Sequence, residues 1–350
     1  MKYTITILGL LAICLIGHSD TQEPNSWKLD SKDIPIPLGA SESLQASLKS
    51  IEQPNIKLRE SQVPRNLEDW NLAIAQRTAS RDVPLERAEK MMEVEIQKDT
   101  IGEVAVYRIE PKVVAKEHSD HIMLYVHGGA YVFGGGDASV AEASIIANSS
   151  RIKVVSVDYR MPPKHPFPQA IDDSITVYKE LLKDHRPAAI ALGGTSAGGG
   201  LALAIIHRLK SLELPQAGAV YAGTPWADLS KTGDTLYTNE GLDRLLVTYN
   251  GTLEAAARLY ANGESLKNPL LSPVYGDFTN FPPTILVTGT RDLFLSDTAR
   301  THQKIRASGG VADLLVFEAM SHAGYLLSLE SPESQQTYQE ISDFLKKHLN

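Results

Sequence analysis

The chain has 350 residues, of which 43% are hydrophobic and 22% are charged, a balance typical of a folded protein with one large core. The formal net charge is −8, and the lysines and arginines are scattered along the sequence. Proteins that bind nucleic acid normally carry a basic stripe, so the composition argues against nucleic acid as a partner.

The first 19 residues have the pattern of a signal peptide. Lys2 precedes an apolar run over 5–16, and Gly17 and Ser19 are the small residues that a signal peptidase requires. The run is too short for a comfortable membrane span, so we expect cleavage, export to the periplasm or the medium, and no stable span afterwards. An uncleaved N-terminal anchor is the alternative. The only cysteine, Cys14, lies in this leader, so the mature chain offers no thiol nucleophile.

Residues 20–90 are expected to form a lead-in followed by short helices. Up to about residue 64 the sequence is rich in Ser, Pro, Gln and charge and has no sustained period. Behind Asn66, which suits an N-cap, residues from Leu67 to Arg77 recur at helical spacing.

Residues 91–350 change to a pattern of strands and helices. Alternation at 91–97 and 103–109 predicts two half-buried strands. Further strands are predicted at 122–126, 153–157, 188–192, 217–222, 284–288 and 313–317, and helices at 170–182, 197–209, 298–307 and 333–349. This order predicts an α/β fold with a mainly parallel central sheet flanked by helices.

Residues 228–268 interrupt the alternation. Leu253, Ala257 and Tyr260 fall at helical spacing between two predicted sheet strands. A long surface excursion without a role is one interpretation. A helical cap inserted above the strand ends is favoured, because the sites of open α/β sheets lie beyond the carboxyl ends of their strands.

The segment Gly194-Thr195-Ser196-Ala197-Gly198 matches the G-x-S-x-G motif between an apolar strand and an Ala- and Leu-rich helix, which is the context the motif requires. The sharp turn exposes the serine hydroxyl at the end of the sheet. A hydroxyl is a weak nucleophile, so it needs an adjacent base. An incidental serine in a glycine-rich turn is the alternative, but the agreement of strand, turn and helix predicts a nucleophile.

The partners of such a serine follow it in the order acid, then histidine. His322 comes directly after the last predicted strand, so we predict that it is the base. Asp292 follows the strand at 284–288 and is predicted to be the acid, which fixes the imidazole tautomer and stabilises the imidazolium. The rival carboxylates are Asp297, nearer the next helix, and Asp228, after an earlier strand.

An acyl-transfer site also needs N–H donors for the oxyanion that forms on the substrate. Gly128, Gly129 and Ala130 follow a predicted strand upstream of the nucleophile, where such a loop belongs, and the N–H of Ala197 is the remaining donor. A glycine-rich turn without a ligand is the alternative, which the pairing with Ser196 disfavours.

From about residue 121 to the C-terminus the sequence resembles the hormone-sensitive-lipase-like esterases, bacterial family IV of the lipolytic enzymes, which have the α/β-hydrolase fold. The likeness rests on the serine motif, Asp292, His322, His127-Gly128-Gly129-Ala130, Asp158-Tyr159-Arg160 with His165-Pro166-Phe167-Pro168, and Pro225-Trp226-Ala227-Asp228-Leu229. The resemblance implies a cap built from N-terminal helices and residues 228–268, and activity on short-acyl esters. The stretch at 288–297 looks especially like members that hydrolyse lactones or acetyl esters.

The sequence departs from the family pattern in three places. Ala130 replaces the third glycine of the oxyanion loop, and Lys164 stands where the family usually has Glu. Ser321-His322-Ala323-Gly324 replaces the usual Pro-His-Gly. None of these changes removes a catalytic group, so they bear on substrate fit.

The sequence therefore predicts a carboxylic ester hydrolase that forms an acyl-enzyme on Ser196 with short-acyl esters or lactones and needs no metal or organic cofactor. A small-molecule receptor without turnover, and an amidase or peptidase with the same triad, are the alternatives. Tyr131, Phe133, Trp226 and Tyr325 are expected to line the substrate pocket, although aromatic residues near sheet ends are often core.

Overall fold

The computed structural model describes residues 31, 33–81 and 84–350. Contacts divide the chain into two units, Met1–Pro35 and Ile36–Asn350. All described helices and strands belong to the second unit. The predicted signal peptide, residues 1–19, lies outside the described residues. Within the part of the chain that is described, no helix combines the length and apolar character needed to cross a membrane.

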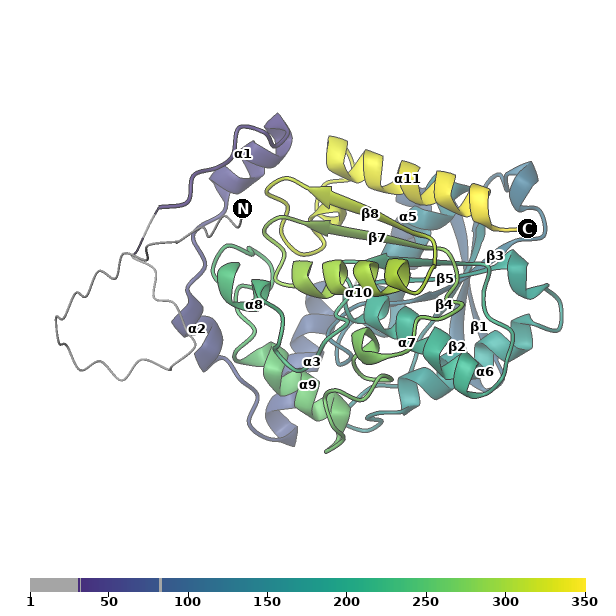
Figure 1. Ribbon diagram of the computed structural model, residues 1–350, viewed down its shortest axis with the longest axis horizontal. Helices are drawn as coiled ribbons and strands as arrows, with labels where there is room; N and C mark the ends of the chain where they lie inside the picture. The colour runs from purple at the N-terminus through teal and green to yellow at the C-terminus, as the bar shows by residue number, and fades with distance from the viewer. Residues whose placement is uncertain (1–30, 32, 82–83) are drawn as a thin grey trace, which may run out of the picture. The chain divides into compact units, whose positions relative to one another are not determined.

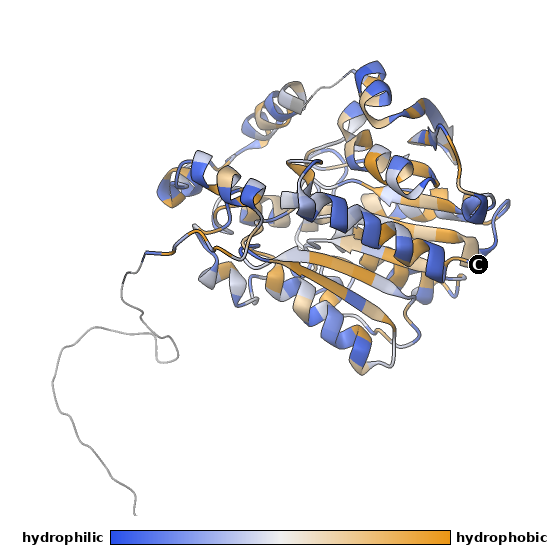
Figure 2. Cartoon of the chain, turned by 90° about the horizontal axis from the view of Figure 1, so that it is seen from above, coloured by the Kyte–Doolittle hydropathy of each residue, from blue (hydrophilic) through white to orange (hydrophobic). Residues whose placement is uncertain are grey.

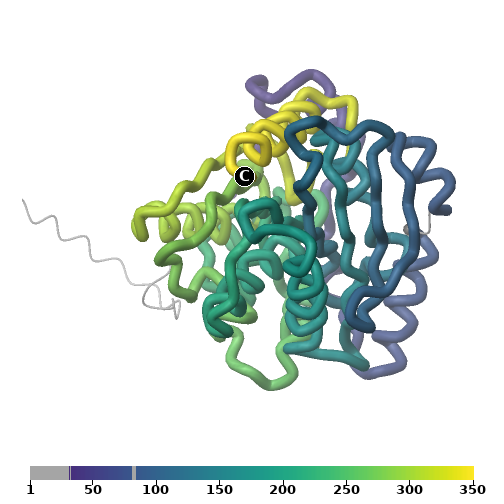
Figure 3. The backbone as a smooth tube through the Cα atoms, turned by 90° about the vertical axis from the view of Figure 1, so that its right-hand side faces the viewer, coloured from purple at the N-terminus to yellow at the C-terminus, as the bar shows by residue number. Residues whose placement is uncertain are grey.

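An eight-stranded sheet runs through the second unit in the order β1-β2-β4-β3-β5-β6-β7-β8 (Figure 1). Its strands are β1 (Val94–Ile101), β2 (Val104–Pro111), β3 (Ile122–Val126), β4 (Lys153–Val157), β5 (Ile190–Thr195), β6 (Ala219–Gly223), β7 (Thr284–Gly289) and β8 (Ala312–Phe317). β2 pairs antiparallel with β1 and with β4, and all other neighbours are parallel. In Figure 3, β1 and β2, in blue, form one edge of the sheet. The predicted mainly parallel sheet is confirmed.

Helices cover both faces of the sheet. They are α1 (Glu42–Ser50), α2 (Ile56–Ser61), α3 (Leu67–Arg81), α4 (Leu85–Met92), α5 (Ala141–Ser150), α6 (Gln169–Leu181), α7 (Ala197–Ser211), α8 (Thr235–Thr238), α9 (Thr252–Ala261), α10 (Leu295–Ala307) and α11 (Pro332–His348). One core cluster joins the sheet to α6, α7 and α10, and another joins it to α5 and α11. The central strands are therefore apolar on both sides, as parallel strands between two helix layers must be, and Figure 2 shows them in orange.

Most predicted elements occur with ends shifted by a few residues. Met91 and Met92, expected in a strand, instead end α4. The strand expected from 188 begins at Ile190, because Pro187–Ala189 form a 3-10 turn before it. Helix α5 was not predicted, because its small residues are buried on several sides and leave no clear helical period.

The loops after β3, β5, β7 and β8 open at the carboxyl ends of parallel strands. The chain passes from β3 outwards to β4 and then back to β5 on the other side of β3. Loops that leave β3 and β5 therefore diverge, and an open α/β sheet binds its ligand at such a point. Residues 127–130 follow β3, Ser196 follows β5, Asp292 follows β7 and His322 follows β8.

Residues 228–268, here called the cap segment, leave the sheet after β6 and return before β7, and they contain α8 and α9. Ala256 of α9 packs in one cluster with Trp70 of α3 and with Phe133, which follows the loop at 127–130. Asn66 caps α3 as predicted, because its side-chain oxygen accepts from Asp69 N at 2.9 Å. The N-terminal helices and the cap segment thus pack together beside the carboxyl ends of the strands (Figure 1).

Candidate active site

A strained turn between β5 and α7 carries Ser196. Its backbone has φ 64° and ψ −123°, a conformation that costs about 1–3 kcal/mol for a residue other than glycine. Ser196 N donates to Gly223 O at 2.8 Å, and Ser196 O accepts from Trp226 N at 2.9 Å, so the β6 side holds the turn. Glycine is required at 198, because a methyl group there would collide with the carbonyl oxygen of Val126.

The side chains of Ser196, His322 and Asp292 form one hydrogen-bonded row. Ser196 Oγ lies 2.8 Å from His322 Nε2, and His322 Nδ1 lies 3.0 Å from Asp292 Oδ1. Asp292 is fully buried and also accepts from Phe294 N at 2.9 Å and from Thr288 Oγ1 at 2.8 Å. A carboxylate held in this way accepts from Nδ1–H and leaves Nε2 free to take the serine proton.

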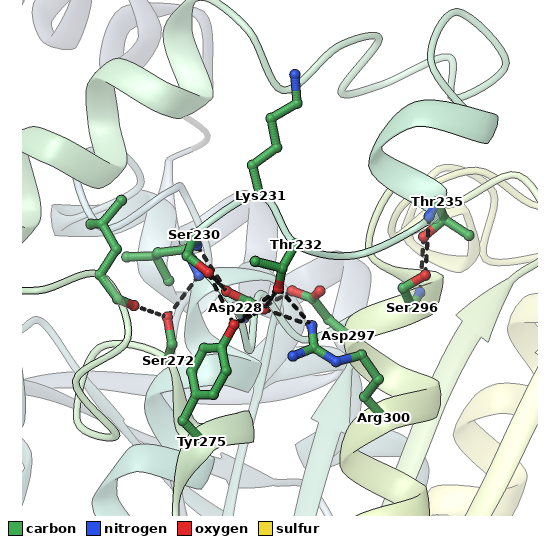
Figure 4. A network of polar contacts seen from close by, with 12 residues as sticks. Asp228, Ser230, Lys231, Thr232, Thr235, Ser272, Tyr275, Ser296, Asp297 and Arg300 are labelled. Carbon is green, nitrogen blue, oxygen red and sulfur yellow. Dashed lines mark hydrogen bonds and ion pairs between the residues drawn. The ribbon is translucent and has the colours of Figure 1, made fainter. Parts of the chain in front are cut away.

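The rival carboxylates belong to a separate polar network at the start of the cap segment (Figure 4). Asp297 Oδ2 accepts from Asp228 N at 2.9 Å. Burial, followed by the negative charge of Asp228, raises the pKa of Asp297 well above its ordinary value. Asp228 is fully buried and pairs with Arg300 at 2.6 Å. Burial acts to raise its pKa too, but hydrogen bonds from Ser230, Thr232 and Arg300 lower it. Both carboxylates are thus engaged in this network, and the one that contacts the His322 ring is Asp292.

The loop after β3 turns through a run of positive φ angles: 120° at Gly129, 54° at Ala130 and 61° at Tyr131. The fold lets Gly129 O accept from Val132 N at 3.1 Å and from Phe133 N at 2.8 Å. A side chain at 129 would collide with the backbone of Phe133, so only glycine fits. Ala130 adopts its left-handed conformation at a cost of roughly 1 kcal/mol.

Residues of the motif at 158–160 contact the start of this loop. Tyr159 stacks on His127 with 4.1 Å between ring centroids, and its hydroxyl donates to His127 O at 2.7 Å. Burial lowers the pKa of His127, and its Nδ1 lies 2.7 Å from Gly128 O. Asp158 accepts from Gly136 N at 2.8 Å. The predicted oxyanion loop is therefore fixed before any substrate arrives.

A cavity of about 300 Å³ brings the predicted residues together. Ser196, His322, Gly128, Gly129 and Ala130 line it. The cap segment and the N-terminal helices also contribute lining residues, which include Leu245, Leu246, Leu253, Arg59 and Arg77. Ala197 is fully buried at the first position of α7, next to the nucleophile. The wall combines apolar side chains with a few polar groups, as small-molecule sites usually do.

Of the four aromatic side chains expected in the pocket, only Phe133 lines the cavity. Tyr131 instead stacks on Tyr260 at 4.1 Å between centroids, and Trp226 stacks on Phe294 at 5.3 Å. Tyr325 is fully buried. The expectation is corrected for these three residues, because the helices and the cap segment enclose them in the core.

Sequence patterns did not point to Glu142, a buried acid that contacts the residue before the nucleophile. Its carboxylate accepts from Tyr125 OH at 2.5 Å, from Tyr221 OH at 2.7 Å and from Thr195 Oγ1 at 2.8 Å. Thr195 directly precedes Ser196, and Glu142 lines the cavity. Burial raises the pKa of Glu142, although these hydrogen bonds act to lower it. Its helix, α5, was not predicted, so no pattern placed an acid at this position.

Comparisons with known proteins agree with this arrangement. A family model described as alpha/beta hydrolase fold matches residues 123–326. An acetyl-hydrolase of Streptomyces hygroscopicus is 30% identical over 225 residues, which are 64% of this chain and 75% of that protein. The crystal structure of an esterase named E25 superposes with a TM-score of 0.89 at 45% identity and covers 93% of this chain and 100% of that one. The structure of an esterase from the bacterial hormone-sensitive lipase family has a TM-score of 0.70 at 28% identity and covers 82% and 100%. The chain therefore belongs to the α/β-hydrolase fold family and is, within it, a carboxylic ester hydrolase of the hormone-sensitive-lipase-like, family IV type.

Proposed function

We propose that the chain hydrolyses short-acyl esters or lactones through an acyl-enzyme on Ser196. The observation that carries the proposal is the row of hydrogen bonds from Ser196 Oγ to His322 and on to Asp292. In the proposed first step Ser196 Oγ attacks the ester carbonyl carbon while His322 Nε2 takes the hydroxyl proton. Asp292 orients the imidazole and stabilises the positive charge that it gains.

The negative charge that develops on the carbonyl oxygen needs fixed donors. The N–H groups of Gly128, Gly129, Ala130 and Ala197 are the proposed donors, and the loss of one such donor typically costs about 10²–10³-fold in rate. Ala197 also stands at the N-terminus of α7, where the helix dipole favours an anion. The rigid contacts of His127 with Tyr159 support preorganisation of this loop.

The remaining steps return the enzyme to its starting state. The bond between the carbonyl carbon and the alcohol oxygen breaks, and His322 gives its proton to the departing alkoxide. Water then attacks the acyl-enzyme while His322 accepts a proton from it. The bond between the acyl carbon and Ser196 Oγ breaks to release the acid, and His322 returns the proton to Ser196 Oγ. A lactone follows the same path, with the alcohol still attached to the acyl group.

The size of the cavity favours small substrates. A volume of about 300 Å³ lies at the lower end of the range for small-molecule sites. Leu245, Leu246 and Phe133 border it and leave limited room for a long acyl chain. A relative named acetyl-hydrolase is consistent with a short acyl group.

The test is hydrolysis of p-nitrophenyl acetate, butyrate and decanoate by the wild type, Ser196→Ala and, as a matched control, Ser211→Ala, which changes an exposed serine near the end of α7. We expect rapid turnover of the two short esters, a slower reaction with decanoate, and a loss of roughly 10⁴–10⁶-fold in Ser196→Ala only. No turnover by the wild type, with rates that match Ser196→Ala on every ester, would leave ligand binding without reaction as the better explanation. A matched p-nitroanilide separates an esterase from an amidase, which would hydrolyse both compounds.

A further inference from the structure

The part of the cap segment at 239–244 contacts both loops that carry the partners of Ser196. The side-chain nitrogen of Asn239 donates to Thr290 O at 3.1 Å and to Asp292 O at 2.9 Å. Five residues further on, Arg244 N donates to Ser321 Oγ at 3.0 Å. The first two contacts hold the loop after β7, and the third holds the residue before His322.

Asp243 lies between these contacts and is fully buried. Its Oδ1 accepts from Leu245 N at 2.9 Å and from Leu246 N at 3.0 Å, which shapes the cap segment itself. Its Oδ2 accepts from Leu293 N at 2.9 Å and from His322 N at 3.3 Å. One carboxylate therefore joins the cap segment, the residue after Asp292 and the backbone of His322.

Within the described part of the chain, the four hydrogen-bond partners of the Asp243 carboxylate are backbone N–H groups, which donate and cannot accept. Charge-assisted bonds of this kind stabilise the carboxylate form and are about twice as strong as neutral ones. Burial, followed by the charge of Asp292, raises the pKa of Asp243, while His322 acts to lower it. Of these two carboxylates, Asp292 contacts the imidazole ring and Asp243 contacts the backbone of His322.

We propose that Asp243 is a positioning residue, which keeps the loops of Asp292 and His322 correctly placed relative to Ser196. The triad is then correctly aligned only while the cap segment is packed against these loops. Asp243 contacts neither Ser196 nor the His322 ring, so it acts through the backbone of the two loops. The hydroxyl of Ser321, at a position where the family usually has proline, adds to these contacts by accepting a hydrogen bond from Arg244 N. This inference rests on the proposed serine mechanism and adds a residue to it.

The experiment compares Asp243→Asn with Asp234→Asn, which neutralises an exposed carboxylate of the same cap segment. In Asp243→Asn one of the two acceptor oxygens becomes an amide that faces N–H donors, so the loops must shift. Small displacements of this kind cost up to roughly 10²-fold in rate, so we expect kcat on p-nitrophenyl acetate to fall by about 10–10²-fold while KM stays within about twofold. Asp234→Asn should match the wild type. An unchanged kcat in folded Asp243→Asn would overturn the proposal.

A double-mutant cycle separates positioning from a general loss of structure. If Asp243 acts by aligning Asp292 with His322, its replacement should cost less than about threefold in a chain that already carries Asp292→Asn. Full multiplication of the two losses would contradict the proposal. The cycle measures turnover above background. It therefore separates a failure of the Asp243 proposal from a failure of the esterase proposal, in which the wild type would be no more active than Ser196→Ala.

Two further measurements keep the proposal testable if Asp243→Asn does not fold or if turnover is absent. Asn239→Ala removes only the two donations to the Asp292 loop, and we expect kcat to fall about 3–10-fold without a change in KM. The downfield proton resonance of the His322 Nδ1–H, which reports its bond to Asp292 without turnover, should shift or broaden in Asn239→Ala and stay unchanged in Asp234→Asn. An unchanged resonance together with an unchanged kcat would reject the proposed role.

Discussion

Two buried carboxylates flank the proposed triad, and their partners differ in kind. Asp243 accepts from four backbone N–H groups, whereas Glu142 accepts from the hydroxyls of Tyr125, Thr195 and Tyr221. A backbone N–H can only donate, but a hydroxyl can rotate and either donate or accept. The environment of Asp243 therefore demands a carboxylate, whereas the environment of Glu142 tolerates a neutral group. Burial alone does not decide how much a charge matters; the chemistry of its partners does.

Among the carboxylates, the largest effect is expected for Asp292, which contacts the imidazole. Asp292→Asn should lower kcat by about 10³–10⁴-fold, because an amide at this position can stabilise the wrong imidazole tautomer. The measurement is steady-state hydrolysis of p-nitrophenyl acetate beside Asp243→Asn. Equal losses in the two variants would mean that direct contact with the ring is not what distinguishes the two carboxylates.

Asp228 and Asp297 also differ in whether their surroundings favour the charged form, and this difference can be tested by measuring stability (Figure 4). Asp228 is paired with Arg300, so Asp228→Asn leaves a cation without its partner. Breaking a fully buried pair costs about 3–5 kcal/mol; because the Arg300 side chain is 32% exposed, we expect about 2–3 kcal/mol from urea unfolding. Asp297→Asn should not lower the free energy of unfolding, because the raised pKa means that the folded environment disfavours the charged carboxylate, which Asn replaces with a neutral amide. A larger cost for Asp297→Asn than for Asp228→Asn would contradict this ranking.

The pKa of Asp297 also predicts a dependence on pH. Its folded-state pKa is raised above the unfolded value, so between these two values the folded chain binds more protons than the unfolded chain. The free energy of unfolding therefore loses a contribution as pH rises through this window. Asp297→Asn removes that contribution, and the variant should gain stability relative to the wild type as pH rises above about 4, the ordinary pKa of an unfolded Asp. Urea unfolding of both proteins at several pH values tests this; a constant difference would mean that Asp297 titrates normally.

Sequence patterns predicted the parts of the site that depend on local order. Ser196 follows a strand and opens a helix, and Asp292 and His322 follow later strands, so their relation could be read from the chain order. Asp243 could not be found in this way. Its contacts lie 50 and 79 residues away on backbone atoms, which leave no mark in the sequence.

Contacts that leave no local sequence pattern also explain the other differences between the predicted and the observed structure. Helix α5 packs small residues on several sides, so its hydrophobic residues do not recur at a clear helical spacing. No pattern therefore pointed to this helix or to Glu142 within it. Tyr131 and Trp226 lie close in sequence to the oxyanion loop and the cap segment, but only the packing of α9 and of the turn before α10 decides that they face the core. The succession of strands and helices along the chain thus follows from sequence patterns, whereas the contacts between loops that meet across the cavity do not.

The smallest effect is expected at Glu142. Gln at this position has nearly the same shape as Glu, and burial, which raises the pKa of Glu142, disfavours the charge that Gln lacks. Its three hydroxyl partners can reorient to accept from the new amide, so Glu142→Gln should lower kcat by less than about threefold and stability by less than about 1 kcal/mol. Glu142→Ala is the matched variant, because it leaves the three hydroxyls without their shared acceptor and should cost roughly 2–4 kcal/mol of stability. A loss of 10²-fold in kcat for Glu142→Gln would mean that the turn at Thr195 needs a charged acceptor, and the contrast with Asp243 would disappear.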